Sequence, residues 1–253
     1  MKTADFSTIL NETVQLCGLD AEDFTVSTFK QLRDFISNRI RLAWEHDRFP
    51  DIVRYELIPV LTINNVNYCV KPSAAGEVFA LWDRNPLSGT RARQVTFHLQ
   101  TTDTEDRLVV LKSYTDGLYI EYRTIPPVLT GLPWNENQPY SINSQCYFDS
   151  GSNSGSLQPT EGKPYSANFY KCLAANTNEN PATHNQIWQE IEIPYIFAKY
   201  LARGAFADYL RSESQFDNAI IAEKEAEALL DAEIDKVIRQ QGQIPRYSFI
   251  KSY

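Results

Sequence analysis

FKQLRDFISNRIRLAWEHDRFPD, residues 29–51, decides how the N-terminal part of this 253-residue chain folds. Apolar residues recur in it at three- and four-residue steps, which predicts an amphipathic helix with one buried face. Ser27 is the expected N-cap, and Pro50 requires the helix to have ended or restarted as a short turn. The expected buried stripe consists of Phe29, Leu32, Ile36, Ile40, Ala43 and Trp44, with Lys30, Arg33, Arg41 and Glu45 off it.

The same periodicity predicts helices at both ends of the chain. A short helix is expected over residues 6–17, where Gly18 supplies a C-terminal stop. Two more are expected after Pro194, the second over residues 217–241 and ended by Gly242. The second stripe is expected to place Ile220, Ala222, Ala226, Leu229, Leu230, Ile234, Val237 and Ile238 on one side.

Between Arg54 and Pro126 the apolar residues alternate instead. Short runs rich in β-branched and aromatic residues are separated by turn-forming pairs such as Asn64-Asn65 and Asp116-Gly117. Six short, mostly antiparallel strands are therefore predicted, and Pro126-Pro127 ends the last of them. They cover residues 57–63, 68–70, 78–82, 95–99, 108–111 and 118–122.

A third kind of sequence runs from Trp134 to Trp188, where aromatic residues stand among Ser, Asn, Gly and Pro. It predicts a small β-module that leans on the rest of the fold, because about fifty residues can scarcely bury a core of their own. Residues 131–139 have the composition of a linker, and residues 149–162 that of a loop.

The predicted fold class is therefore α+β. The N- and C-terminal helices are expected to form a helical bundle, since each must bury its apolar stripe, and the β-structure is an insertion into it. The expected boundaries are 1–54 for the N-terminal helices, 55–130 for the antiparallel β domain, 131–190 for the small β-module, 191–242 for the C-terminal helices and 243–253 for a tail.

No catalytic motif is present. His46, His98 and His184 have no partner at metal-ligand spacing, and the sequence contains no phosphate-binding or nucleophile motif. Carboxylate pairs such as Glu223 with Glu227 are expected on a solvated helix face. The chain is predicted not to be an enzyme and to need no cofactor or metal. Its four cysteines are expected to be buried thiols, with a Cys146–Cys172 disulfide as the alternative.

The charge balance limits the partners. The formal net charge is -8, so no overall positive field attracts phosphate groups, and tight nucleic-acid binding is not expected. The N-terminus lacks the apolar core of a signal peptide, and no run of about 18 apolar residues occurs. Synthesis in the cytoplasm without a membrane span is therefore expected.

Three stretches resemble the head–tail adaptor (connector) proteins of tailed bacteriophages. Residues 29–51 resemble their N-terminal helix, which ends in Ala-Trp-Glu and an aromatic-Pro-acidic turn. Residues 204–215, continuing to 238–243, are similar to their closing helices, and residues 119–127 to one of their strands. The resemblance implies a structural virion protein of the neck: a ring, twelve-fold to match the portal, that extends the DNA channel and connects to tail, stopper or nozzle proteins.

Residues 134–188 resemble small chitin-binding-type carbohydrate-binding modules. The matching positions are Trp134, Tyr140, Tyr147, Tyr170-Lys171, Pro181 and Trp188, whereas the loop at 149–162 and Asn143-Ser144 depart from the pattern. Aromatic residues stack on sugars but equally form the core of so small a unit. Trp134, Tyr140, Tyr170 and Trp188 are therefore expected to form a core or subunit contact, with glycan binding as the alternative function.

The tail is the expected portal-docking segment. Aromatic residues interspersed with Arg and Lys are the types that most often anchor interfaces. The candidate docking residues are Arg246, Tyr247, Phe249, Lys251 and Tyr253. A tail without a role remains the alternative there. For the whole chain, physical arguments alone leave a monomeric α+β binding domain equally open. Two further expectations follow from the adaptor resemblance: a monomer that assembles only on a portal, and a helical frame that folds without residues 134–188.

Overall fold

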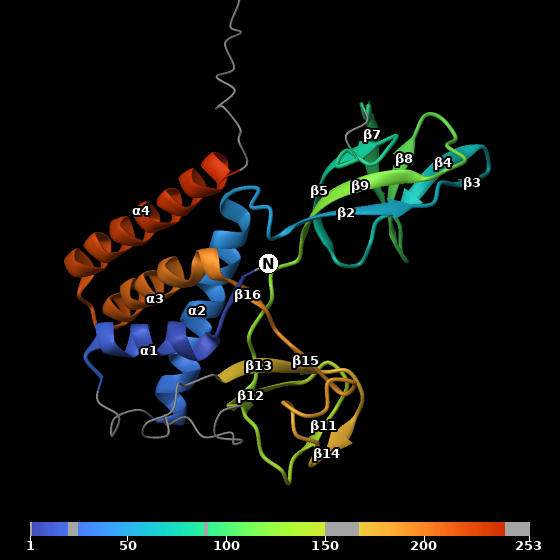
Figure 1. The fold of residues 1–253 in the computed structure, drawn as a ribbon. Coiled ribbons are helices and arrows are strands. Elements are labelled where there is room, and N and C mark those ends of the chain that lie inside the picture. The colour runs from blue at the N-terminus through green and yellow to red at the C-terminus, as the bar shows by residue number, and fades with distance from the viewer. Residues whose placement is uncertain (1, 20–24, 89–90, 150–166, 241–253) are drawn as a thin grey trace, which may run out of the picture. The chain divides into compact units, whose positions relative to one another are not determined.

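The computed structural model describes residues 2–19, 25–88, 91–149 and 167–240 and has an α+β fold with four α-helices and several antiparallel sheets (Figure 1). The chain divides into two compact units. Unit 1 combines both ends, Met1–Asp47 and Pro127–Tyr253, and unit 2 is the inserted segment Arg48–Pro126. Residues 48–54, expected with the N-terminal helices, belong to unit 2.

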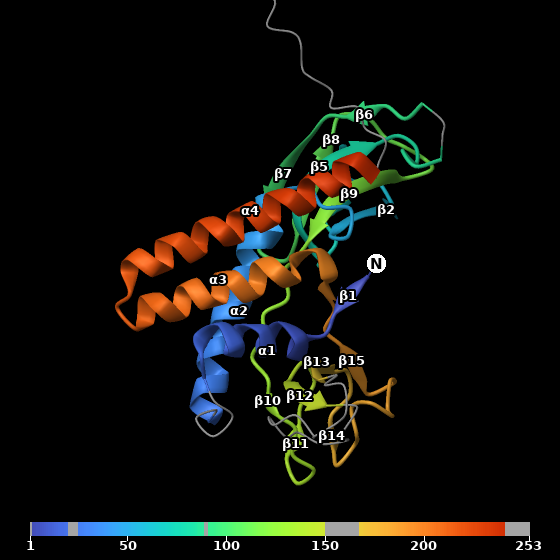
Figure 2. The same cartoon turned by 60° about the vertical axis from the view of Figure 1, so that its left-hand side comes forward.

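All four helices belong to unit 1. α1, α2 and α4 each pack against α3, and Figure 2 shows α3 running alongside α4. Within the described residues, no helix is both long and apolar enough to cross a membrane. The helices are α1 (Phe6–Cys17), α2 (Val26–His46), α3 (Ala198–Ser212), preceded by the 3₁₀ turn η1 (Tyr195–Phe197), and α4 (Phe216–Gln240).

Local sequence explains where the helices begin and end. Gly18 ends α1 in the left-handed conformation, at φ 65°, as its position predicts. The N-cap of α2 is Thr25 rather than Ser27, because the Thr25 hydroxyl accepts a hydrogen bond from the Thr28 N–H at 3.2 Å. The predicted stripe of α4 is wrong at Ile220, which is exposed, whereas Ala222, Ala226 and Leu230 are buried.

Unit 1 also contains short strands. In its main sheet, β12 pairs antiparallel with β13 and parallel with β10, so the expected linker contains an edge strand. Two further two-stranded pairs, β11 with β14 and β1 with β16, complete the strands. The strands are β1 (Thr3–Ala4), β10 (Leu132–Pro133), β11 (Pro139–Tyr140), β12 (Gln145–Asp149), β13 (Ala167–Cys172), β14 (Asn176–Thr177), β15 (Trp188–Glu190) and β16 (Ile193–Pro194).

The main sheet of unit 1 shares a core with the helices. Phe6 of α1 packs edge-on against Phe169 of β13 with ring centroids 4.7 Å apart, and Phe29 of α2 lies 5.0 Å from Tyr147 of β12. The buried Asn168 adds polar links, since its Oδ1 accepts from the Phe6 N–H at 2.6 Å. Residues 131–190, expected as a small β-module that leans on the rest of the fold, pack with the helices as part of unit 1.

Unit 2 is a β structure with its own core. Its two four-stranded antiparallel sheets, β2-β9-β5-β6 and β3-β4-β8-β7, bury one cluster of apolar side chains that includes Ile58, Leu81, Leu108 and Ile120. Pro59 and Val60 split the first predicted strand in two. The strands are β2 (Val53–Ile58), β3 (Leu61–Ile63), β4 (Val66–Val70), β5 (Ala75–Trp82), β6 (Gln94–Val95), β7 (Phe97–Thr101), β8 (Asp106–Val110) and β9 (Leu118–Thr124).

The chain enters and leaves unit 2 through neighbouring strands. β2 and β9 pair antiparallel from Val53 opposite Arg123 to Ile58 opposite Leu118. The Thr124 N–H also donates to the Ile52 carbonyl at 3.0 Å. Unit 2 is therefore inserted into unit 1 through two adjacent chain segments.

Candidate functional site

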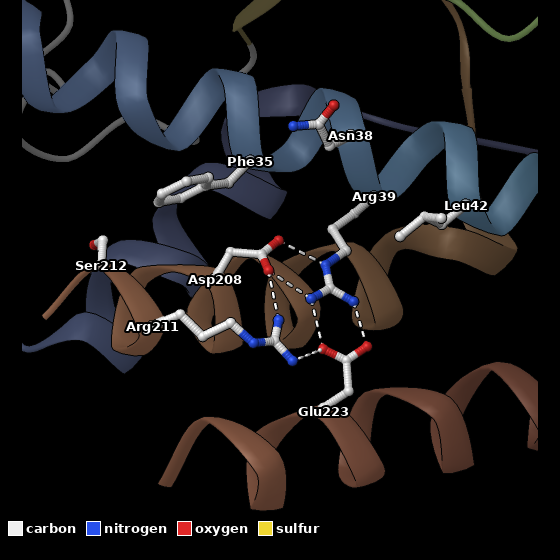
Figure 3. Close-up of a pocket in the computed structure, with 8 residues that line it drawn as sticks. All are labelled: Phe35, Asn38, Arg39, Leu42, Asp208, Arg211, Ser212 and Glu223. Atoms are coloured by element: carbon white, nitrogen blue, oxygen red, sulfur yellow. Dashed lines mark hydrogen bonds and ion pairs between the residues drawn. The ribbon is translucent and has the colours of Figure 1, made fainter. Parts of the chain in front are cut away.

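A groove of about 600 Å³ lies among α2, α3 and α4 (Figure 3). Phe35 and Leu42 lie on either side of Arg39 along α2, so one wall is apolar around a single charged residue. The helix period explains this, because positions three and four apart share a face. The lining residues are Phe35, Asn38, Arg39 and Leu42 from α2, Asp208, Arg211 and Ser212 from α3, and Glu223 from α4.

Arg39 joins the three helices at the base of the groove. Its side chain is only 3% exposed. The guanidinium donates two hydrogen bonds of 2.7 Å to the carboxylate of Asp208 on α3. It donates two more to Glu223 on α4, one of them at 2.6 Å. Such forked pairing fixes direction as well as distance, so Arg39 holds α3 and α4 in a defined orientation against α2.

Arg211 completes the network. It donates to Asp208 at 2.7 Å and to Glu223 at 2.9 Å, so two cations and two anions neutralise one another. Burial would lower the pKa of Arg39, but its hydrogen bonds to Glu223 and Asp208 raise the pKa above the ordinary value. The hydrogen bond from Arg39 lowers the pKa of Glu223, outweighing the burial that would raise it. Both shifts favour the charged forms of Arg39 and Glu223.

Gly204 makes room for this arginine. A Cβ at position 204 would lie 2.8 Å from Cδ of Arg39. Because the guanidinium is fixed at its far end by four hydrogen bonds, the side chain has little freedom to move aside. A glycine in the interior of α3, which intrinsically disfavours a helix, therefore has a packing reason.

The network is suited to holding helices together and not to acid–base or nucleophilic chemistry. Both carboxylates that line the groove, Asp208 and Glu223, are already bound to two arginines, so neither is placed as a free general base. No group of three or more His, Cys, Asp or Glu that could hold a metal ion occurs among the residues that the structure describes. What the groove offers a partner is its apolar wall, where Leu42 is exposed.

The four aromatic residues expected at a glycan or subunit contact belong to one core of unit 1. Tyr140, Tyr170 and Trp188 are buried, and Trp134 is half-buried against them. Trp188 is only 2% exposed, and its indole N–H donates to the Glu179 carbonyl at 3.0 Å. These rings therefore lie together in one core of unit 1.

A second depression of about 620 Å³ lies beside this core. Tyr170 and Trp188 form part of its lining, together with the exposed polar residues Asn185, Gln189 and Glu190. Burial raises the pKa of Glu190 above its ordinary value, and the nearby charges of Asp5 and Glu192 raise it further. The depression combines ring edges with polar groups.

Two other predicted features can be placed. The cysteines are free thiols, with Cys69, Cys146 and Cys172 buried and Cys17 half-buried, so the structure contains no Cys146–Cys172 bond. Burial is the cause that raises the pKa of Cys69 to about 11. The candidate docking residues Arg246, Tyr247, Phe249, Lys251 and Tyr253, and the predicted loop beyond Asp149, lie outside the described residues.

The sequence did not identify the Arg39 network. Glu223 was expected on a solvated face, but it lies against Arg39 and Arg211. Two signals were present: Arg39 lies at the edge of the apolar stripe of its helix, and Gly204 interrupts a predicted helix. Neither signal identifies the residues that bind Arg39, because Asp208 and Glu223 follow Arg39 by 169 and 184 positions.

The sequence matches no protein-family model, and no curated protein is significantly similar to it. Function is therefore inferred from the residues and from their geometry.

Proposed function

We propose that this chain is a structural protein of a bacteriophage virion, a head–tail adaptor whose copies form a ring below the portal and extend the channel for DNA. The proposal places it in the neck, between the portal and the tail, stopper or nozzle proteins. It takes the four helices as the adaptor's bundle and the β-structure as insertions.

The main support is the construction of unit 1. Described residues from both sides of the inserted unit 2 build it, α1 and α2 packing against α3, and β1 pairing with β16. The buried Arg39 network ties three of the helices by forked ion pairs instead of offering a reactive group. A unit built this way holds a fixed shape, which an assembly part needs and a substrate site does not explain.

The charge is a second support. A chain with a net charge of -8 does not attract the phosphates of DNA, so DNA passes without release of its counterions. A twelve-fold ring follows from the resemblance to adaptors and from templating by the portal, because heterologous contacts close only when the rotation divides a full turn. Isolated protein is expected to stay monomeric until a portal ring is present.

The test uses the tail. Truncation after Gly242 is expected to leave the melting temperature unchanged and to weaken co-sedimentation with purified portal rings on the order of tenfold or more, because buried aromatic anchors dominate interfaces. A full-length control with Tyr247→Ala, Phe249→Ala and Tyr253→Ala separates lost anchors from lost length. Undiminished co-sedimentation of both variants, or a symmetric dimer that persists in the virion, would contradict the proposal.

The depression beside Tyr170 and Trp188 favours one second candidate, an accessory virion protein that binds host glycans. The variants Asn185→Ala and Gln189→Ala test it on a glycan array, since both side chains line the depression and are exposed. Trp188→Ala is not a suitable test of glycan binding, because loss of a fully buried ring is expected to unfold the core. Saturable binding that both substitutions abolish would support the second candidate over the adaptor.

A further inference from the structure

One face of the sheet β2-β9-β5-β6 in unit 2 is open and rich in aromatic residues. Ile58, Leu81 and Ile120 of this sheet point into the apolar cluster that it shares with the other sheet of unit 2. Because side chains alternate along a strand, the residues next to them lie on the opposite face. That opposite face is here called the aromatic face. Its residues are Tyr55 and Leu57 of β2, Trp82 of β5, Tyr119 and Glu121 of β9, and Gln94 of β6.

Part of the aromatic face is a row that crosses the sheet. Leu57, Tyr119 and Trp82 lie opposite one another on β2, β9 and β5, and Gln94 lies opposite Trp82 on the edge strand β6. Leu57 is 51% exposed, and the two rings are half-buried. Neighbouring strands lie about 4.8 Å apart, which is close to the length of one pyranose ring. The row therefore presents apolar side chains in steps that match successive sugars of a chain.

Glu121 holds two rings of this face in place. The Trp82 indole N–H donates to Oε2 of Glu121 at 3.0 Å, and the Tyr55 hydroxyl hydrogen-bonds the same carboxylate. Rings that are fixed before a ligand arrives lose less conformational freedom when it binds. A carboxylate can accept about four hydrogen bonds, so Glu121 keeps the capacity to accept from a ligand hydroxyl as well.

The polar groups of the aromatic face select among the ligands that stack on rings. Nucleic-acid bases also stack on aromatic side chains, but the carboxylate of Glu121 repels the phosphates that accompany them. It repels acidic sugars for the same reason. A neutral sugar instead combines an apolar ring face with hydroxyl groups, and Glu121 and the exposed amide of Gln94 supply hydrogen-bonding partners for these hydroxyls.

We propose that the aromatic face of unit 2 binds a neutral oligosaccharide. Its pyranose rings stack on Trp82 and Tyr119, and its hydroxyl groups hydrogen-bond Glu121 and Gln94. The site is distinct from the depression of unit 1, because all its residues belong to unit 2. The inference goes beyond the adaptor function and does not depend on it.

A glycan array and calorimetric titration test the site. The full chain is screened against cellohexaose, maltohexaose, mannohexaose and other neutral oligosaccharides, and the strongest ligand is titrated. Saturable binding is expected, and Tyr119→Ala is expected to weaken it on the order of tenfold. Tyr119→Phe keeps the ring and is expected to retain binding. Tyr195→Ala is the matched control, since it removes an exposed tyrosine of unit 1 and is expected to change nothing.

Melting temperatures accompany each titration, so that lost folding is not mistaken for lost binding. If Tyr119→Ala unfolds unit 2, Tyr55→Ala replaces it, because Tyr55 is exposed. The titrations are repeated with Asn185→Ala, which alters the depression of unit 1 and is expected to leave binding intact.

Four results would overturn the inference. They are no binding to any neutral glycan, binding that Tyr119→Ala leaves unchanged, binding that only Asn185→Ala abolishes, and stronger binding of oligothymidylate than of any glycan. Analytical ultracentrifugation of the full chain adds a further check, since self-association that Tyr119→Ala removes would assign the face to a second copy instead. Portal co-sedimentation is expected to be the same in all these variants, so failure here leaves the adaptor proposal standing.

Discussion

Arg39 is the residue on which the orientation of three helices depends. In Arg39→Met, the apolar stem remains, but Asp208 and Glu223 lose their main cation inside a partly buried site. Breaking a buried ion pair in this way costs about 3–5 kcal/mol, and the exposure of both carboxylates places the loss at the lower end. Urea denaturation monitored by helical circular dichroism measures the loss.

Arg41→Met is the matched control. Arg41 lies two positions further along the same helix, is exposed and has no ion pair within the described residues. Its replacement is expected to change the free energy of unfolding by less than about 0.5 kcal/mol. Equal losses in the two variants would mean that Arg39 contributes only helix propensity.

Glu223 adds a dependence on pH. Because Arg39 lowers the pKa of Glu223 in the folded protein, ionised Glu223 stabilises the fold above its ordinary pKa of 4.5. This contribution is lost as the pH falls from 4.5 through the lower folded value. Glu223→Gln is expected to flatten the loss of stability in this range, measured as the urea midpoint against pH, whereas the exposed Glu227→Gln keeps the wild-type slope. Parallel curves for all three proteins would contradict the assignment.

At the scale of elements, the contact between the main sheet of unit 1 and the helices α1 and α2 is expected to determine whether sheet and helices unfold together. Phe169 lies against Phe6 and Tyr147, with centroids 4.7 and 5.3 Å apart. Phe169→Ala is expected to cost about 3–5 kcal/mol and to lower the melting temperatures of sheet and helices together. Near-UV and far-UV circular dichroism follow the two parts, and the exposed Ile142→Ala is the control. A helical transition unmoved by Phe169→Ala would show that the sheet is separable.

This contact also changes the expectation for removing residues 134–188. The deletion takes away Tyr147 and Phe169, so it uncovers Phe6 and Phe29, which are fully buried in the intact unit. We now expect the helices to lose stability in that variant. The sequence could not indicate this, because the helical stripes look complete on their own and aromatic contacts across more than 100 positions leave no periodic signal.

Where the local pattern is strong, the sequence predicted the elements well. The residues of α1 were predicted to both ends, and each predicted strand of unit 2 overlaps a strand of the structure, because alternation and turn pairs are local properties. The prediction that Ile220 lies on the buried face was wrong, because an apolar stripe alone does not show where a partner helix ends. The groove was not predicted for a related reason, since Arg39, Asp208 and Glu223 meet only after the helices pack.

At the scale of the whole molecule, unit 2 is expected to fold alone. Residues 48–126 contain both sheets and the apolar cluster around Leu81 and Ile120. Expressed as an isolated segment, they are expected to unfold cooperatively in urea, in a single transition seen by both near-UV and far-UV circular dichroism. Leu81→Ala should cost about 2–5 kcal/mol there, and Leu87→Ala, an exposed position, almost nothing. A non-cooperative transition would show that this core is incomplete without unit 1.

The paired strands through which unit 2 is inserted also set its mechanical response. The hydrogen bonds of an antiparallel pair run perpendicular to the strands, and β2 and β9 begin and end the unit side by side. Tension along the chain therefore pulls residues 48 and 126 apart across those bonds, which open one residue pair at a time from Val53 and Arg123 onward, as a zipper does. Strands loaded along their length must break all their bonds at once and resist higher force. The inserted unit thus acts as an extensible segment of the chain under load.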